Sequence, residues 1–157
     1  MSWIFSVRSA AAAGIRIADF FERHGEPSFR LLEATQLRTA LGRAFEHHEP
    51  AVLALGGGTY AQQGAPEFLR AQGVPVIWLD SPIETLLSRC TTMTGRPLFR
   101  DEASFRALYA QRIPSYQLAD FRVDSGRDPA LVVGDILRLS IFSKADPDSR
   151  LLVEEPR

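Results

Sequence analysis

Two kinds of residue in this sequence are suited to holding a small anion: an unbroken run of glycines and a set of arginines. The glycines Gly56–Gly58 directly follow the apolar stretch Ala51–Leu55. Arginines lie in the segments FRLLE, GRPLF and QRIPSY, at Arg30, Arg96 and Arg112. An arginine fork binds a carboxylate or phosphate through two hydrogen bonds, and glycine lets a ligand approach the backbone. A tight strand-to-helix turn would also use glycine, but together these residues predict a small-anion pocket.

The elements that must position these residues alternate between strand and helix. Three apolar runs predict buried strands: Ala51–Leu55, Val74–Asp80 and Phe121–Ser125. Helical patterns cover the segments between them: Ile15–His24, Glu26–Phe45, Pro66–Gln72, Pro82–Cys90, Ser104–Arg112 and Pro129–Ser140. This alternation indicates an α/β fold with a parallel sheet and helices on both faces. Ligands of such sheets bind at the carboxyl ends of the strands, where the glycines lie.

Local signals predict where several of these elements begin and end. Ser81 is the expected N-cap of the fourth helix, and Glu84 is its capping-box partner. The helix from Ser104 is expected to be interrupted near Pro114, because proline lacks an N–H. Between these helices, Thr91–Asp101 has an irregular, arginine-bearing pattern that predicts a flexible loop.

Composition favours one cytoplasmic domain of an ordinary globular kind. The chain has 157 residues, of which 1–142 are expected to form the domain and 143–157 a polar tail. The net charge of −1 gives no sign of a nucleic-acid or membrane surface. The single cysteine cannot form an internal disulfide, and no signal sequence is recognisable, which favours a reducing cytoplasm. The three histidines do not form a metal-binding pattern, so no metal ligands are assigned.

The motifs in their order resemble the shikimate kinase family. The similarity runs from about Gly14 to Leu139 and rests on GIRIADFFERHGEPSFRLLE, ALGGGT, VIWLDSPIETLLSR, GRPLF and QRIPSYQLAD. It implies a three-layer P-loop kinase-like fold and ATP-dependent phosphorylation of shikimate to shikimate 3-phosphate, with ATP and Mg²⁺ as cofactors. It also implies that the bound polyol packs against the glycines, where a Cβ would collide.

The same resemblance assigns roles to individual residues. It implies that shikimate is bound by the arginine and glutamate of FRxxE, the triple glycine and the arginine of RxPxY: Arg30, Glu33, Gly56, Gly57, Gly58 and Arg112. It places three arginines on the ATP side, with Arg96 in a mobile lid: Arg89, Arg96 and Arg127.

The chain departs from this family at its start. It contains no GxxxxGK[ST] motif, and its one lysine, Lys144, lies near the C-terminus. Acidic residues that would serve the acceptor hydroxyl and magnesium are expected near Ile4 and Ser6, and neither is acidic. Because the family's first strand is central, two strand edges should be left unpaired. Either Trp3–Val7 fills a sheet position, or the chain is poorly folded or self-associates.

Three functions are compatible with these observations. One is a shikimate kinase, although the chain as written is expected to transfer phosphate poorly or not at all. The second is a non-catalytic remnant that binds the acceptor or a partner protein. The third is another small-molecule P-loop kinase, such as a gluconate kinase, against which the GGG run with Arg30 and Arg112 argues.

Overall fold

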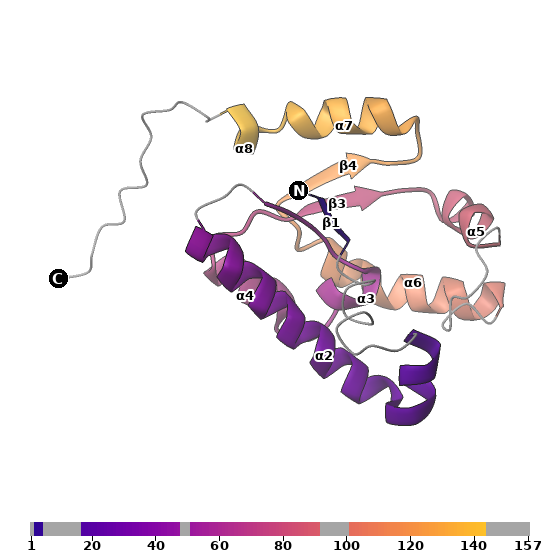
Figure 1. Cartoon of the computed structure of the whole chain (residues 1–157). Helices are drawn as coiled ribbons and strands as arrows, with labels where there is room; N and C mark the ends of the chain where they lie inside the picture. Colours follow the sequence, from indigo (N-terminus) through magenta and orange to yellow (C-terminus); the bar gives the residue numbers. More distant parts are fainter. Residues whose placement is uncertain (1, 5–16, 48–50, 92–100, 144–157) are drawn as a thin grey trace.

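The computed structural model describes residues 2–4, 17–47, 51–91 and 101–143. Strands and helices alternate along most of the chain and form a layered arrangement (Figure 1). The strands are β1 (Ser2–Ile4), β2 (Val52–Ala54), β3 (Ile77–Asp80) and β4 (Phe121–Asp124). The helices are α2 (Ile17–His47), α3 (Gly57–Tyr60), α4 (Ala65–Ala71), α5 (Ile83–Thr91), α6 (Glu102–Tyr116), α7 (Pro129–Leu137) and α8 (Ser140–Ser143).

All described strand pairs are parallel, which confirms the α/β class. β1 pairs with β2, where Trp3 lies opposite Leu53. β3 pairs with β4, where Leu79 lies opposite Val123. These pairs form two separate two-stranded sheets, and within the described residues β2 and β3 form no ladder with each other. Trp3 and Ile4 of the predicted Trp3–Val7 segment therefore occupy a sheet position in β1, whereas residues 5–7 lie outside the described residues.

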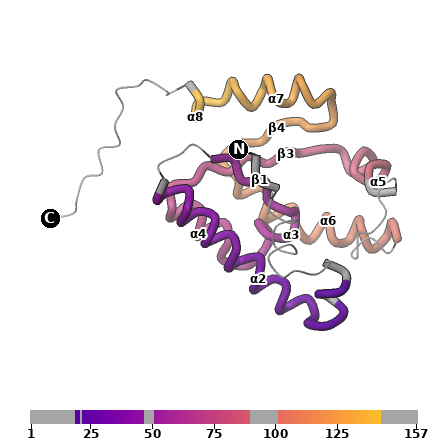
Figure 2. Tube along the Cα trace, viewed as in Figure 1, coloured from indigo at the N-terminus to yellow at the C-terminus, as the bar shows by residue number. Residues whose placement is uncertain are grey.

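Both half-sheets pack against one hydrophobic core. The centre of this core consists of four buried side chains from α2, α3 and α4: Leu37, Leu41, Tyr60 and Leu69. Leu53 of β2 packs on it, as do Leu55, which directly follows β2, and Val76, which directly precedes β3. The helices α2, α3, α4 and α6 lie on this side of the strands, while α7 lies on the other (Figures 1 and 2).

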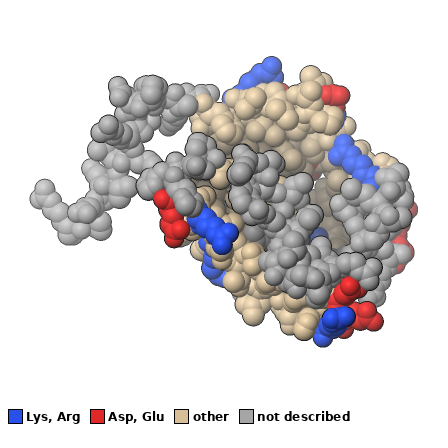
Figure 3. All heavy atoms as spheres, viewed as in Figure 1, with Lys and Arg blue, Asp and Glu red and all other residues tan. Residues whose placement is uncertain are grey.

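Charged side chains are interspersed on the face shown in Figure 3, where blue and red groups neighbour each other. Within the residues that the structure describes, no helix is both long and apolar enough to cross a membrane.

Gly25 divides α2 at the position that the sequence predicts. Its backbone has φ 74° and ψ 170°, a combination that is open to glycine and strained for other residues. The helical turns before Gly25 and the long segment after it therefore form two helices joined at a kink, and Pro27 falls in the first turn of the second.

Two local predictions are wrong. The helix α6 is not interrupted near Pro114 but continues to Tyr116, because the proline falls in its last turn and removes only one hydrogen bond. The capping box at Ser81 does not form either. The Ser81 hydroxyl is buried without a partner in the described structure, and Glu84 bonds Arg106 instead at 2.8 Å. A charged donor is a stronger partner for that carboxylate than a backbone N–H.

Some predictions lie mostly outside the described residues. The arginine-bearing loop falls on 92–100, which includes Arg96, and the polar tail falls on 144–157.

Two glycines of α2 should respond oppositely to substitution by alanine. A Cβ at Gly42 would meet nothing within 4 Å, so Gly42→Ala should raise the free energy of unfolding by about 0.5–1 kcal/mol. Gly25→Ala should lower the same free energy by about 1–3 kcal/mol, because it forces alanine to a φ of 74°. Urea denaturation measures both. Equal effects of the two substitutions would contradict the kink at Gly25.

Candidate functional site

A buried carboxylate, Glu33, lies at the centre of the candidate site. Its side chain is only 3% exposed and accepts three hydrogen bonds. Arg30 Nη1 donates to Oε2 at 2.7 Å, Thr59 Oγ1 donates to Oε1 at 2.8 Å, and Gln62 Nε2 donates to Oε2 at 3.0 Å. Because Thr59 and Gln62 follow the glycines, this carboxylate ties the glycine turn to α2.

The guanidinium of Arg30 is held between two carboxylates on its own helix. Nη1 pairs with Glu33 and Nη2 pairs with Glu26, both at 2.7 Å. Burial by itself lowers the pKa of Arg30, but hydrogen bonds and charges from Glu26 and Glu33 outweigh it, so the pKa ends above its ordinary value. The arginine fork is therefore charged and oriented before any ligand binds.

The glycines are required for space. Gly57 and Gly58 begin α3, and Gly56 precedes it with φ −66° and ψ 147°, which any residue can adopt. A Cβ on Gly58 would lie 2.5 Å from Arg30 Nη1, and a Cβ on Gly57 would lie 2.9 Å from the Tyr116 hydroxyl. From the sequence, a bound ligand is expected to fill the space next to the glycines. At Gly57 and Gly58, however, side chains of the protein itself already lie against the position that a Cβ would take.

Tyr116 connects the glycine turn to α6. Its hydroxyl donates to the Gly57 carbonyl at 2.7 Å, and its ring lies 5.9 Å from that of Trp78, centroid to centroid. Burial raises the pKa of Tyr116, although the charge of Arg112 and a hydrogen bond with it act in the opposite direction. Arg112 Nη1 lies 3.7 Å from the position that a Cβ on Gly57 would take.

The structure therefore brings most of the predicted acceptor residues together. Arg30 lies against Gly58, and Arg112 lies against Gly57, so both guanidinium groups border one short turn after β2. Glu33 does not face this turn as a free carboxylate, because its oxygens accept hydrogen bonds from the protein. Such an arrangement offers positive charge and exposed backbone to a small anion with hydroxyl groups.

Sequence reasoning missed three supporting residues of this site. Thr59 and Gln62 bind Glu33, and Tyr116 binds the turn. Tyr116 is the tyrosine of the RxPxY motif, so the sequence contained a signal that could have identified it. Thr59 directly follows the glycines, but nothing in the sequence marks Gln62, which lies 29 residues from Glu33.

The arginines predicted on the ATP side lie in a different place. Arg89 Nη2 donates to the Ser125 carbonyl at 3.2 Å, after β4. Arg127 follows on the same loop and pairs with Asp135 and, at 3.6 Å, with Asp124. Arg89 and Arg127 thus border one loop, but acidic partners already engage Arg127. Arg96 is outside the described residues.

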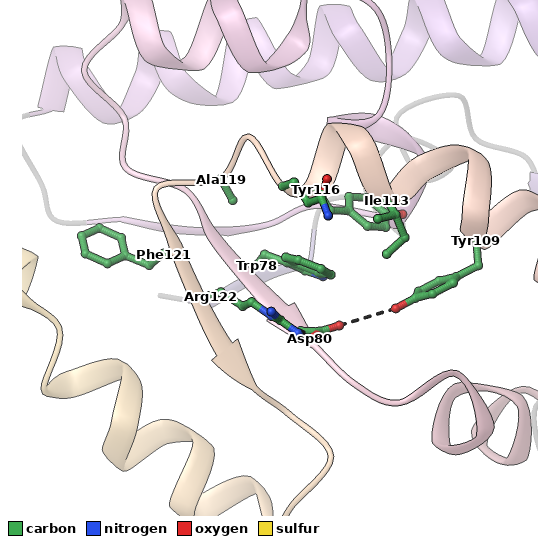
Figure 4. A pocket seen from close by; sticks show the side chains of 9 residues that line it. Trp78, Asp80, Tyr109, Ile113, Tyr116, Ala119, Phe121 and Arg122 are labelled. Carbon is green, nitrogen blue, oxygen red and sulfur yellow. Dashed lines mark hydrogen bonds and ion pairs between the residues drawn. The ribbon is translucent and has the colours of Figure 1, made fainter.

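An open cavity of about 350 Å³ lies between β3, β4 and α6 (Figure 4). Its wall includes Trp78, Phe121, Tyr109 and Tyr116, and one end is closed by an ion pair of 2.5 Å between Arg122 and Asp80. The Tyr109 hydroxyl donates to Asp80 at 3.5 Å. Burial and the nearby carboxylate raise the pKa of Tyr109, which keeps it a hydrogen-bond donor at neutral pH.

The described residues offer no evident group of metal ligands. They contain no cluster of three or more His, Cys, Asp or Glu side chains that could bind a metal. Glu26 and Glu33, the carboxylates beside Arg30, are both engaged by that arginine. The one lysine of the sequence, Lys144, directly follows α8.

The described residues thus form a parallel α/β domain with two arginines beside a glycine turn, and comparisons with known proteins identify its family. The shikimate kinase family model matches residues 9–139. The shikimate kinase of Cereibacter sphaeroides is 38% identical over 138 residues, which are 86% of this chain and 66% of that protein. The chain thus spans about two thirds of that relative's length.

Solved structures agree with this assignment. The shikimate kinase of Aquifex aeolicus superimposes with a TM-score of 0.70 at 30% identity, over 85% of this chain and 76% of that one. The shikimate kinase of Acinetobacter baumannii, solved in complex with shikimate, gives a TM-score of 0.75 at 29% identity, over 89% of this chain and 78% of that one. The chain belongs to the shikimate kinase family.

Among the carboxylates of the site, Glu33 should be the one whose substitution lowers the stability of the fold most. Glu33→Gln replaces a buried acceptor of three hydrogen bonds, so we expect the free energy of unfolding to fall by about 1–3 kcal/mol. Glu26→Gln is the matched control, because Glu26 is 54% exposed and pairs with the same arginine. It should cost less than about 0.5 kcal/mol. Chemical denaturation compares the two, and similar losses would refute the central role of Glu33.

Proposed function

We propose that this chain binds shikimate at the glycine turn, as the phosphate acceptor of an ATP-dependent kinase reaction that forms shikimate 3-phosphate. The observation that supports this most is the convergence of Arg30 and Arg112 on Gly57 and Gly58. A relative of similar structure was solved in complex with shikimate, which makes this acceptor the first candidate.

The chemistry of the turn suits a small cyclic acid with several hydroxyls. Arg112 lies beside Gly57 and is not drawn into an ion pair among the described contacts, so it is the better candidate for the ligand carboxylate. Arg30 is oriented by two carboxylates and adds positive charge on the other side of the turn. Gly57 is exposed, so its backbone can lie close to a ligand hydroxyl, although Tyr116 already bonds its carbonyl oxygen.

Phosphoryl transfer needs parts that the described residues do not supply. Positioning and electrostatic stabilisation provide almost all of the catalysis in this reaction class. ATP and Mg²⁺ are the expected donor and ion, yet the described residues contain no metal cluster and the sequence no GxxxxGK[ST] loop. The chain by itself is therefore proposed to bind the acceptor more effectively than it turns it over.

A binding-only function is the second candidate. It is favoured by the same absence of a lysine-bearing phosphate loop from the sequence. It differs from the first candidate only in whether a phosphate-binding segment completes the site. A gluconate kinase remains the third possibility, and competition between the two acids for the same site would separate it from the first.

Acceptor binding can be tested directly by calorimetry with shikimate. We expect Arg112→Ala to weaken binding at least about tenfold, because a charged hydrogen bond to the carboxylate is lost. Arg138→Ala is the matched control, since Arg138 is 80% exposed and pairs with Asp135 on α7. Equal affinities of the Arg112 variant and the control would exclude this turn as the acceptor site, and preference for gluconate would reassign the substrate.

Turnover can be tested with two forms of the protein. Shikimate-dependent release of ADP should be at least about 10²-fold slower for this chain than for one preceded by a strand, a GxxxxGK[ST] loop and an acidic segment. The reason is that several charge-stabilising groups are absent together. Comparable rates would show that another phosphate site exists in the chain. If neither form is active while shikimate still binds, the binding-only function is correct.

A further inference from the structure

The open cavity between β3, β4 and α6 is not used by the proposed acceptor site, although Tyr116 borders both. Its volume of about 350 Å³ lies at the lower end of the range of about 300–1,000 Å³ that ligand pockets usually have. Empty packing defects are normally apolar, whereas Asp80, Tyr109 and Arg122 contribute polar groups to this lining. The cavity therefore suits a small molecule with one ring or two fused rings.

Four aromatic side chains of the described structure line this cavity. Trp78 comes from β3, Phe121 from β4, and Tyr109 and Tyr116 from α6. The Tyr116 hydroxyl donates to the Gly57 carbonyl at 2.7 Å, so this residue offers its ring to a ligand. The faces of aromatic rings carry partial negative charge and attract cations as well as the edges of other rings. The lining therefore favours positive groups and flat rings over anions.

A cation of the protein itself already lies against this lining. The Arg122 Cζ is 5.0 Å from the centre of the Trp78 ring. Figure 4 shows Arg122 next to Trp78 and Asp80, at the end of the cavity that Tyr109 approaches from α6. The Arg122 side chain is 69% exposed, so it borders the cavity and leaves the interior open. The aromatic lining thus accepts a positive group, and a cationic ligand is compatible with the same rings.

Asp80 has acceptor capacity left for a ligand. Nε and Nη2 of Arg122 both donate to Oδ2 of this carboxylate, at 2.9 and 2.5 Å. Among the described contacts, Oδ1 receives a bond from the Tyr109 hydroxyl alone, and its length of 3.5 Å exceeds the usual range of about 2.5–3.0 Å. The Asp80 side chain is only 17% exposed, which limits its access to water. A donor group of a ligand would therefore satisfy Oδ1.

We propose that this cavity binds a small amine that carries a flat ring, an arylalkylammonium ion. Its ammonium group donates a hydrogen bond to Asp80 Oδ1, beside the Tyr109 ring. Its flat ring packs against the aromatic lining formed by Trp78 and Tyr116. The ligand does not need to displace Arg122, because that guanidinium uses the other oxygen of Asp80.

Two other occupants fit this chemistry less well. An anion would meet the carboxylate of Asp80 and the negative faces of the rings, and the guanidinium of Arg122 in the lining is already paired with Asp80. A lysine side chain of another protein would bring an ammonium group but no ring for the aromatic part of the cavity. A free amine with a ring uses both parts. This assignment does not depend on the proposed function.

Calorimetric titration of the full chain with phenethylamine tests the cavity. Two control compounds each remove one feature of the proposed ligand: ethylamine lacks the ring, and 3-phenylpropionate has a carboxylate in place of the ammonium group. We expect phenethylamine to bind at least about tenfold more tightly than either control. The reason is that it alone can use the aromatic lining and the Asp80 carboxylate together.

Chain variants locate the binding on the protein. Asp80→Asn should weaken phenethylamine binding at least about tenfold, because it removes the charged acceptor. Asp124→Asn is the matched control, since Asp124 lies opposite Asp80 on β4, is 61% exposed and does not line the cavity. Arg122→Ala should instead tighten binding at least about threefold, because a cation that competes for Asp80 is removed.

A second variant tests the cavity without changing any charge. Ile113 lines the cavity from α6, so Ile113→Trp should fill the place of the ligand ring and abolish binding of phenethylamine. Circular dichroism of each variant checks that it folds like the parent chain.

Four results would overturn the proposal. These are equal affinities for the three compounds, equal binding by the Asp80 and Asp124 variants, weaker binding by the Arg122 variant, and normal binding by a folded Ile113→Trp variant. None of these measurements includes shikimate or ATP, so the amine site and the proposed function can fail separately.

Discussion

The buried carboxylate of Glu33 is the interaction on which the candidate site depends. Burying a charge is unfavourable unless charged and polar donors surround it, and here Arg30, Thr59 and Gln62 do so. These donors come from two parts of the chain that are far apart in sequence. Satisfying one carboxylate therefore orients Arg30, attaches the glycine turn to α2 and brings the end of β2 to its place.

The triple glycine follows from the same constraint. Arg30, which pairs with Glu33 on the same helix, lies so close to the turn that a Cβ on Gly58 would be 2.5 Å from its Nη1. On the other side of the turn, the Tyr116 hydroxyl lies similarly close to Gly57. Arg112, one helical turn before Tyr116 on α6, lies next to the same glycine. Glycine is required here by the close approach of the protein's own side chains. The resulting turn has a guanidinium group on each side, and that of Arg30 is paired with Glu26 and Glu33.

The residues predicted to form the site lie in two places in the described structure. Those proposed to bind the acceptor lie together on α2, α3 and α6, around the glycine turn after β2. Arg89 and Arg127, which the sequence resemblance places on the ATP side, lie beside the loop after β4, where Arg127 is paired with Asp135. Among the described residues, β2 pairs with β1 and β3 pairs with β4, so the two places belong to different strand pairs.

The sequence by itself determined the α/β class, the parallel strands and the break between helices at Gly25, since these depend on local patterns and short spacings. It was wrong at Pro114 and Ser81, where one proline in a last turn and one competing arginine changed the outcome. Only the tertiary structure decided that Glu33 is an internal anchor and that Tyr116 and Gln62 support the turn. These features arise from contacts between residues about 30 to 60 positions apart, and the pairing of such donors is set by how the elements pack.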